Sequence, residues 1–171
     1  AVTHQCFPKA SLLVVREPPD ILYLPRGYLK QFAYVLAPDA RYQWHPGHIM
    51  GQFGQNWHVE KHYYDLRDMG VPEKPCELAG VITQKKSTPS QCWRVALAEA
   101  VSAKMWQRFD RFGRGVRRLD LKWDAVAPYK YHLTIENGCW PHYWTEKLTD
   151  AFLGWSLPLY IGDPCIYDYF P

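Results

Sequence analysis

The chain has 171 residues, of which 47% are hydrophobic and 22% are charged, and these are ordinary values for a globular protein. Disorder is not expected, because disordered chains combine few apolar residues with a high net charge. The net charge of +3 is too small to indicate a nucleic-acid-binding protein, although it would suit an anionic small molecule.

The first part of the chain alternates apolar runs with loops. We predict a strand at residues 11–15, a short helix at 28–32 and a strand at 33–37. The first strand ends before Pro18 and Pro19, which continue neither a helix nor a ladder. A loop rich in glycine, histidine and tryptophan follows over about 38–58, and the sequence VPEKP at 71–75 resembles a linker.

Beyond this linker the predicted strands and helices alternate along the chain. The strands are expected at 78–83, 106–112, 131–135 and 157–161, and the helices at 90–104, 120–127 and 145–154. Such alternation implies right-handed βαβ units and a parallel sheet, so the fold class is α/β. Ligands of such sheets bind beyond the carboxyl ends of strands, where Glu136-Asn137 and Gly162-Asp163-Pro164 lie.

The segment YHLTIENGCWPHYWTEK, residues 131–147, is the most informative of the chain. An apolar strand runs into Glu136 and Asn137, and Thr145 is the expected N-cap of the next helix. Lys147 then falls in the first turn, where the helix dipole disfavours a cation by about 0.3 kcal/mol or more. Free N–H groups and a lysine at one helix start form a good phosphate site, so we expect an anion between them.

The same segment carries a family resemblance. EN, a short loop, YWTEK, an apolar helix and LPLYIGDP, in this order, resemble the signature of the α-1,3-fucosyltransferases of glycosyltransferase family 10. The resemblance covers residues 129–171 nearly without interruption and residues 11–57 loosely. It implies a GT-B-type enzyme in which residues 75–171 form a Rossmann-like domain that binds a GDP-sugar. Residues 1–74 would be part of an acceptor-side domain whose early strands are missing.

The resemblance implies an inverting transfer of L-fucose from GDP-fucose to a hydroxyl of an oligosaccharide or glycoconjugate. This reaction needs a base for the acceptor, positive charge for the departing diphosphate, and a geometry that aligns the two. No cofactor is firmly implied besides the donor substrate. Two alternatives stay open: another nucleotide-sugar, because a diphosphate site does not report the sugar, or a fragment that binds the nucleotide without catalysis.

The resemblance assigns five donor-binding residues. Lys147 matches the family's TEK lysine, and Arg94 lies early in the first helix of the donor domain, so both are expected to hold the diphosphate. Either cation could instead be a solvated residue of a helix surface. Glu146 resembles the ribose ligand, although a glutamate is favoured at any helix start. Asn137 and Tyr143 would flank the nucleotide.

Other polar residues near the predicted donor site are ambiguous. Glu136 ends a buried strand, where a carboxylate is usually functional or tightly paired. The sequence leaves open whether Glu136 touches the donor or holds the loop. Lys85, Lys86 and Ser87 lie on a strand-to-helix loop, where a solvated charge cluster is favoured over a phosphate contact.

Glu17 is the predicted catalytic base. In the family a glutamate just after a buried acceptor-side strand is the proposed base, and LLVVREPPD resembles that pattern. Arg16 replaces the usual glycine, and a neighbouring guanidinium would weaken the carboxylate as a base if the two interact. The alternatives are a structural role for Glu17, or Asp20 as the base.

The histidines suggest a metal site only weakly. His45 and His48 are three residues apart, and His58, Glu60 and His62 could share an ion, but their spacing is not HExxH. The donor strands carry no DxD pair. We therefore expect no essential metal, with Lys147 and Arg94 supplying the positive charge.

The cysteines are odd in number and form no CxxC motif: Cys6, Cys76, Cys92, Cys139 and Cys165. We expect buried or incidental thiols and a reducing compartment rather than a disulfide scaffold. The resemblance fits a cytoplasmic or membrane-peripheral protein in a bacterium and a Golgi protein in a eukaryote. Because the chain opens without methionine, we expect a fragment or a processed chain, so any membrane association would depend on missing segments.

Overall fold

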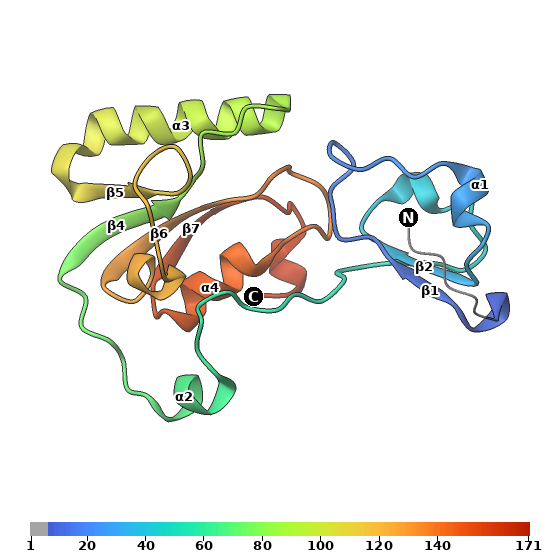
Figure 1. Ribbon diagram of the computed structural model, residues 1–171, viewed down its shortest axis with the longest axis horizontal. Coiled ribbons are helices and arrows are strands. Elements are labelled where there is room, and N and C mark those ends of the chain that lie inside the picture. The colour runs from blue at the N-terminus through green and yellow to red at the C-terminus, as the bar shows by residue number, and fades with distance from the viewer. Residues whose placement is uncertain (1–6) are drawn as a thin grey trace. The chain divides into compact units, whose positions relative to one another are not determined.

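The computed structural model describes residues 7–171, and these divide into two compact units. Unit 1 contains the described residues up to Gly54 together with residues 138–143 and 163–171. Unit 2 contains residues 55–137 and 144–162. Each unit is built on one parallel sheet (Figure 1), so the predicted α/β class is confirmed.

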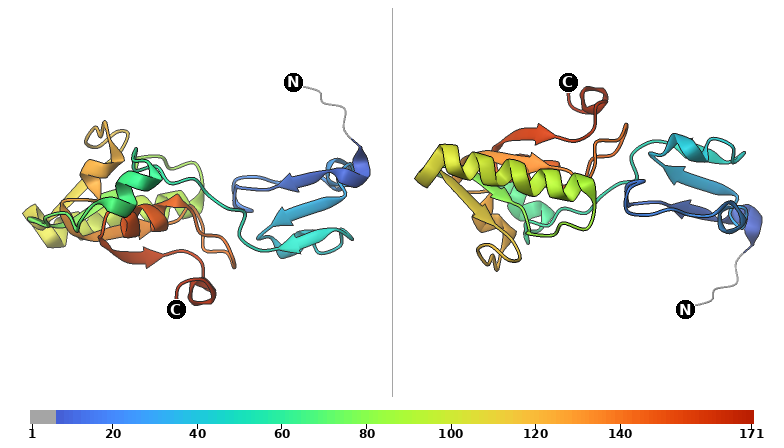
Figure 2. Two further views of the ribbon diagram at one scale, coloured as in Figure 1. Left: turned by 90° about the horizontal axis from the view of Figure 1, so that it is seen from below. Right: turned by 90° about the horizontal axis from the view of Figure 1, so that it is seen from above.

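The sheet of unit 1 has three parallel strands in the order β1-β2-β3, visible side by side in Figure 2. The elements of this unit are η1 (Pro8–Ala10), β1 (Leu12–Val14), α1 (Arg26–Leu29), β2 (Tyr34–Ala37), η2 (Ala40–Tyr42), β3 (His48–Met50) and η5 (Ile166–Asp168). Its core is a cluster of buried apolar side chains that includes Leu29 and Val35. The strand β3 was not predicted, because three residues are too few to show a period of two.

Unit 2 contains a four-stranded parallel sheet in the order β5-β4-β6-β7. Its elements are α2 (Tyr63–Asp68), β4 (Cys76–Val81), α3 (Pro89–Met105), η3 (Trp106–Arg108), β5 (Phe109–Phe112), η4 (Lys122–Ala125), β6 (Tyr129–Ile135), α4 (Glu146–Leu153) and β7 (Leu157–Ile161). The predicted elements beyond residue 75 are therefore present. Two differ in detail: the strand expected at 106–112 begins only at Phe109, and the helix expected at 120–127 is a short 3₁₀ turn.

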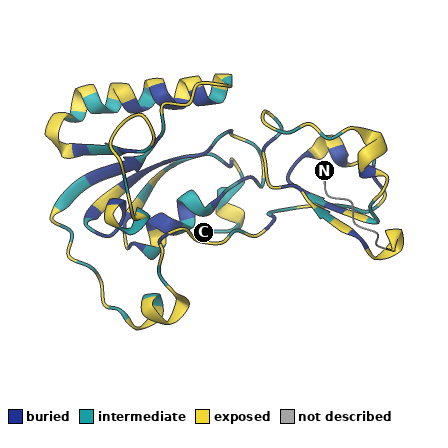
Figure 3. Ribbon diagram, viewed as in Figure 1, coloured by how far each residue is buried: buried dark blue, intermediate teal, exposed yellow. Residues whose placement is uncertain are grey.

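Helices cover both faces of the sheet in unit 2, with α3 on one face and α4 on the other (Figures 1 and 2). The side chains of β6 alternate between the two faces of the sheet, so apolar residues on each face need a covering element. Leu133 and Ile135 pack in a cluster with Ala98 of α3. His132 points the other way, and its Nδ1 lies 3.2 Å from the carbonyl oxygen of Ala125 in η4. Both faces of β6 are buried over residues 132–135, whereas Lys130 and Tyr131 are exposed; Figure 3 colours the ribbon by burial.

The strand order creates a topological switch point between β4 and β6. The chain leaves β4 through α3 to reach β5 on one side, and then crosses to β6 on the other side of β4. Ligands of open parallel sheets bind beyond the carboxyl ends of the strands at such a point. The N-terminus of α3, capped by Thr88, follows β4, and the N-terminus of α4, capped by Thr145, follows β6.

The boundary predicted between residues 74 and 75 falls inside unit 2. Residues 69–75 are irregular, as a linker would be. However, the ammonium group of Lys74 donates hydrogen bonds to the backbone carbonyls of Ala127, at 2.6 Å, and Gly154. These bonds attach the segment to the body of unit 2, and burial lowers the pKa of Lys74.

Free thiols are found at four described positions, and Cys6 lies outside the described residues. Cys92 and Cys139 are exposed, whereas Cys76 and Cys165 are half-buried, so all four fit the expectation of buried or incidental thiols. Within residues 7–171, none of the helices combines the length and the apolar character that a bilayer span requires.

The acid sensitivity of unit 2 should depend on His132. Burial, together with the charge of Lys122, lowers the pKa of this imidazole from 6.5 to about 4. The unfolded chain therefore binds a proton that the folded chain excludes. The stabilisation is fully present above about pH 6.5 and is lost as the pH falls towards 4, which amounts to about 3 kcal/mol.

In the His132→Asn variant the amide can still donate to Ala125, but the titrating group is gone. We expect its free energy of unfolding, measured by urea denaturation, to fall by about 3 kcal/mol less than that of the wild type between pH 7 and pH 4. Parallel pH profiles for the two proteins would contradict this assignment.

Candidate functional site

Five of the residues that the sequence predicted for donor binding belong to unit 2: Arg94, Glu136, Asn137, Glu146 and Lys147. Glu136 and Asn137 directly follow β6, whereas Glu146 and Lys147 open α4. Arg94 belongs to the second turn of α3. The switch-point topology thus brings residues that are far apart in the sequence to the carboxyl edge of one sheet.

Arg94 is buried, with 5% of its surface exposed. Its Nη1 donates a hydrogen bond of 2.7 Å to the side-chain oxygen of Asn137. This bond joins α3 to the end of β6 across the switch point. The structure therefore excludes the alternative of a solvated surface arginine.

Glu136 is the most connected carboxylate at this edge. Its side chain is buried and accepts hydrogen bonds from the backbone N–H of Thr145 at 2.7 Å and from the Thr145 hydroxyl at 2.8 Å. Its own N–H donates to the carbonyl of Ile161 in β7 at 2.9 Å. A Cβ atom added to Gly162 would lie 2.6 Å from the Glu136 Cγ, so the close approach of β7 depends on glycine. Glu136 is thus tightly paired and holds the start of α4.

Lys147 completes this arrangement. Its ammonium lies 3.2 Å from a carboxylate oxygen of Glu136, 3.0 Å from the Thr145 hydroxyl and 3.8 Å from the carboxylate of Glu146. The sequence predicted that a lysine in the first turn of α4 needs a bound anion, but the structure shows that a protein carboxylate already lies beside it. The carboxylate of Glu136 supplies negative charge where the sequence suggested a phosphate alone.

Glu146 is held in its ionised form by its neighbours. Burial by itself would raise the pKa of this carboxyl group, but the charges of Lys147, Lys122 and His58 outweigh it, so the pKa is lowered. The imidazole Nδ1 of His58 lies 3.9 Å from the Glu146 carboxylate. An ionised carboxylate can accept hydrogen bonds from two neighbouring hydroxyl groups.

A second set of polar residues extends this site, and sequence reasoning missed it. Asp150 is fully buried, forms an ion pair of 2.5 Å with Lys122 and accepts the backbone N–H of His58 at 2.8 Å. The backbone N–H of Lys122 donates in turn to Glu60 at 2.9 Å. The sequence contained one indication of this second set: Glu146 and Asp150 are four residues apart, which places both on one face of α4.

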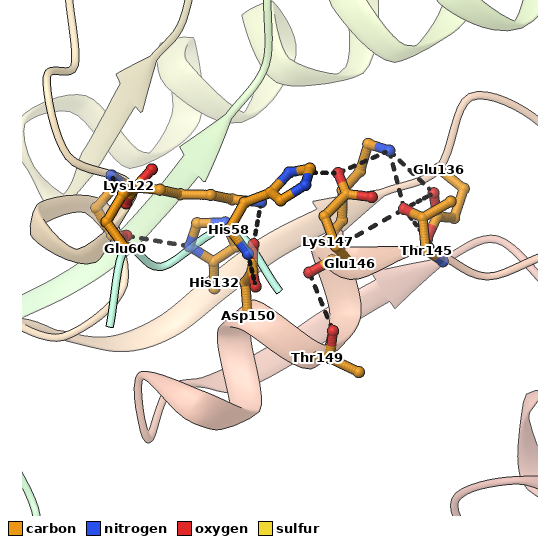
Figure 4. A network of polar contacts seen from close by, with 11 residues as sticks. His58, Glu60, Lys122, His132, Glu136, Thr145, Glu146, Lys147, Thr149 and Asp150 are labelled. Carbon is orange, nitrogen blue, oxygen red and sulfur yellow. Dashed lines mark hydrogen bonds and ion pairs between the residues drawn. The ribbon is translucent and has the colours of Figure 1, made fainter. Parts of the chain in front are cut away.

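The two sets form one network, which Figure 4 shows from Glu60 at one end to Glu136 at the other. The contacts alternate between acidic and basic groups along α4. Burial raises the pKa of Asp150, although Lys122 opposes this shift. Because each charged group has an opposite neighbour, the side chains are held in position before any ligand binds.

A cleft of about 990 Å³ opens at the carboxyl ends of β4 and β5, within unit 2. Glu60 and Lys122 line it, so one end of the polar network faces this space. Arg114 also lines the cleft, as does Lys85, which belongs to the loop where the sequence favoured a solvated charge cluster over a phosphate contact. The cleft therefore presents several cations to a ligand.

Three residues considered for the chemistry belong to unit 1. Glu17 is exposed just beyond the end of β1, and its role as the base stays a prediction. Asp20, the alternative base, accepts a hydrogen bond of 3.2 Å from the indole of Trp140. Tyr143 is only 1% exposed and packs on Phe53 with ring centroids 6.1 Å apart. Its ring is therefore a core side chain of unit 1, and its contact with a nucleotide stays a prediction.

The histidines singled out in the sequence have other partners. His45 accepts the N–H of Gly47 at Nδ1, and its Nε2 lies 3.1 Å from the carbonyl of Phe32. His48 Nε2 lies 3.2 Å from the carbonyl of Ala37. The backbone N–H of His62 donates a hydrogen bond of 3.3 Å to the carboxylate of Asp65 at the start of α2. These hydrogen bonds give His45, His48 and His62 a role in holding the local backbone.

No family model matches the chain. A protein of Acanthamoeba polyphaga mimivirus named putative fucosyltransferase is 40% identical over 48 residues, which is 28% of this chain and 8% of that protein. Solved structures give much wider matches. A crystal structure of an α1,3-fucosyltransferase aligns with a TM-score of 0.61 and 17% identity, covering 94% of this chain and 54% of the other.

Two further α1,3-fucosyltransferase structures match in the same way. One, with GDP-fucose, has a TM-score of 0.55 and 16% identity over 91% of this chain and 53% of the other. The other, with GDP, has a TM-score of 0.58 and 15% identity over 94% and 55%. The chain thus spans about half the length of these structures and shares their GT-B fold, as the sequence resemblance implied.

The site geometry predicts that Glu136 is essential for stability. Replacing it with alanine removes the acceptor of the Thr145 N–H and the partner of Lys147, both at a buried helix start. We expect Glu136→Ala to lower the free energy of unfolding by about 3 kcal/mol, measured by urea denaturation.

Glu73→Ala is the matched control, because Glu73 is an exposed carboxylate of the same unit. It should change the free energy by no more than about 0.5 kcal/mol. Equal stabilities for the two variants would contradict the role assigned to Glu136.

Proposed function

We propose that this chain contributes the donor site of an enzyme that transfers L-fucose from GDP-fucose to a hydroxyl of a glycan acceptor, with inversion. One observation carries the proposal: Arg94, Glu136, Asn137, Glu146 and Lys147 lie together at the switch point of the parallel sheet of unit 2, whereas Tyr143 belongs to unit 1. The fold shared with structures determined with GDP-fucose and with GDP supports the same ligand.

In this proposal Lys147 and Arg94 bind the diphosphate. An ammonium group has three N–H donors, and the hydrogen bonds of Lys147 to Glu136 and Thr145 use two of them. A phosphate oxygen would take the third. Because both cations are already positioned by neighbouring side chains, they stabilise the leaving group without rearranging during the reaction.

The negative charge of Glu136 reduces the attraction that Lys147 alone exerts on a phosphate. The remaining attraction must come from Arg94 and from the basic residues that line the cleft, Lys85 and Arg114 among them. The ionised carboxylate of Glu146 is suited to accept hydrogen bonds from the ribose hydroxyls.

The transfer step needs a base on the acceptor side, and we assign this role to Glu17. Its carboxylate would take the proton of the acceptor hydroxyl while that oxygen bonds to the anomeric carbon. The bond from this carbon to the GDP oxygen breaks on the opposite face, which inverts the configuration. The exposure of Glu17 beyond a strand end supports the assignment, because a base must reach a substrate in solution.

Two other functions predict different measurements. An enzyme that uses another nucleotide-sugar would bind UDP or CMP at least as tightly as GDP in calorimetry. A nucleotide-binding module would bind GDP tightly but transfer no fucose to any glycan. A fucosyltransferase should prefer GDP and release it in step with acceptor fucosylation.

Lys147→Ala should weaken GDP binding by about 2 kcal/mol, or about 30-fold, because a charged hydrogen bond to phosphate is lost. Isothermal titration calorimetry measures this change directly. Lys104→Ala is the control, since Lys104 is an exposed lysine near the far end of α3 and should leave the affinity within twofold. An unchanged affinity in the folded Lys147→Ala variant would remove Lys147 from the donor site.

Glu17→Gln should reduce the rate of fucosyl transfer at least about 100-fold while leaving GDP affinity unchanged, because only proton transfer is affected. Asp20→Asn is the matched variant, as Asp20 is the other exposed carboxylate of the same loop. It should retain transfer activity. Loss of activity in Asp20→Asn alone would assign the base to Asp20 instead.

A further inference from the structure

Unit 1 brings together three potential metal ligands that the proposed transfer reaction does not use. They are His142, Cys165 and Asp168, and their ligand atoms all lie within 4.8 Å of one another. His142 lies in the loop between β6 and α4, whereas Cys165 and Asp168 follow β7. The fold thus brings together residues that are far apart in the sequence, so the sequence alone does not indicate this group.

One buried carboxylate holds the backbone of two of these ligands. Asp163 is 3% exposed, and its Oδ1 accepts the backbone N–H of His142 at 2.8 Å and that of Cys165 at 2.8 Å. His142 also has a φ of 60°, a left-handed conformation that is uncommon outside glycine. Such conformations persist where the surroundings fix them, and they cluster at binding sites.

The imidazole of His142 is also oriented by a neighbour. Its Nδ1 lies 3.0 Å from the hydroxyl of Tyr169, and the two rings meet edge to face at 5.9 Å. When Nδ1–H donates to this hydroxyl, Nε2 keeps the lone pair that a metal needs. Histidine ligands usually have their second nitrogen fixed by a hydrogen bond of this kind.

We propose that His142, Cys165 and Asp168 bind a zinc ion in unit 1. The set offers one nitrogen, one sulfur and one oxygen, which suits zinc, whereas magnesium and calcium prefer oxygen ligands alone. Metal-ligand bonds of about 2.0–2.3 Å place tetrahedral ligands about 3.5 Å apart, so the side chains must close by about 1 Å. Asp168 is exposed and can make this adjustment.

Binding would convert the thiol of Cys165 to a thiolate, and its proton passes to the buffer. A water molecule would complete the four-coordinate shell. The ion would link residues 138–143 to residues 163–171, the two segments by which the chain returns to unit 1. The site therefore has a structural role, separate from the diphosphate site built on α4.

Cobalt(II) tests the site, because it replaces zinc in such shells and shows a thiolate charge-transfer band. We expect one Co²⁺ per chain, with this band and displacement by equimolar Zn²⁺. Cys165→Ser should abolish the band and weaken Zn²⁺ binding at least about 10-fold. Cys92→Ser and Cys139→Ser should keep both properties, since these exposed thiols lie outside the group.

The same proteins give a second measurement through thermal unfolding. Zn²⁺ should raise the melting temperature of the wild type and of Cys92→Ser but not that of His142→Gln. Mg²⁺ at the same concentration should leave all three unchanged. The proposal is overturned if the wild type shows no thiolate band, or if the band persists in Cys165→Ser.

Discussion

The ion pair and hydrogen bonds of one buried carboxylate hold the site of unit 2 together. Glu136 leaves the end of β6 and binds the N–H and hydroxyl of Thr145, which starts α4, as well as the ammonium of Lys147. A strand end and a helix start are thereby fixed to each other. Without this carboxylate, a lysine at the positive pole of α4 would be disfavoured.

This constraint continues along α4 through alternating charges. Lys147 contacts Glu146, Glu146 lies near His58, and the backbone of His58 donates to Asp150, which pairs with Lys122 beside the cleft. The network (Figure 4) therefore links Lys147 at the helix start to Lys122, which lines the cationic cleft.

The sequence predicted the elements with strong local patterns. The helix α4 follows from Thr145 as N-cap and from apolar residues at helical spacing, and β7 from a continuous apolar run. The three-residue strand β3 and the boundary after Gly54 have no such pattern, because they depend on contacts between distant segments.

For the site residues, too, the sequence predicted positions from local motifs but not the contacts between distant segments. Motif resemblance located Arg94, Glu136 and Lys147, but the sequence could not show that Glu136 neutralises Lys147. Lys122 pairs with Asp150 only because η4 and α4 lie on the same face of the sheet. The group around His142 needs the return of the chain after β7, which no spacing rule indicates.

In the proposed donor site, the ammonium of Lys147, held by Glu136, receives the diphosphate. Nitrogen-15 NMR of lysine-labelled protein during a GDP titration would detect this contact at the Lys147 ammonium itself. We expect the Nζ resonance of Lys147 to shift in a saturable way, at the same GDP concentration that saturates calorimetry. A Lys147 resonance that stays unchanged at saturating GDP would contradict diphosphate binding by Lys147.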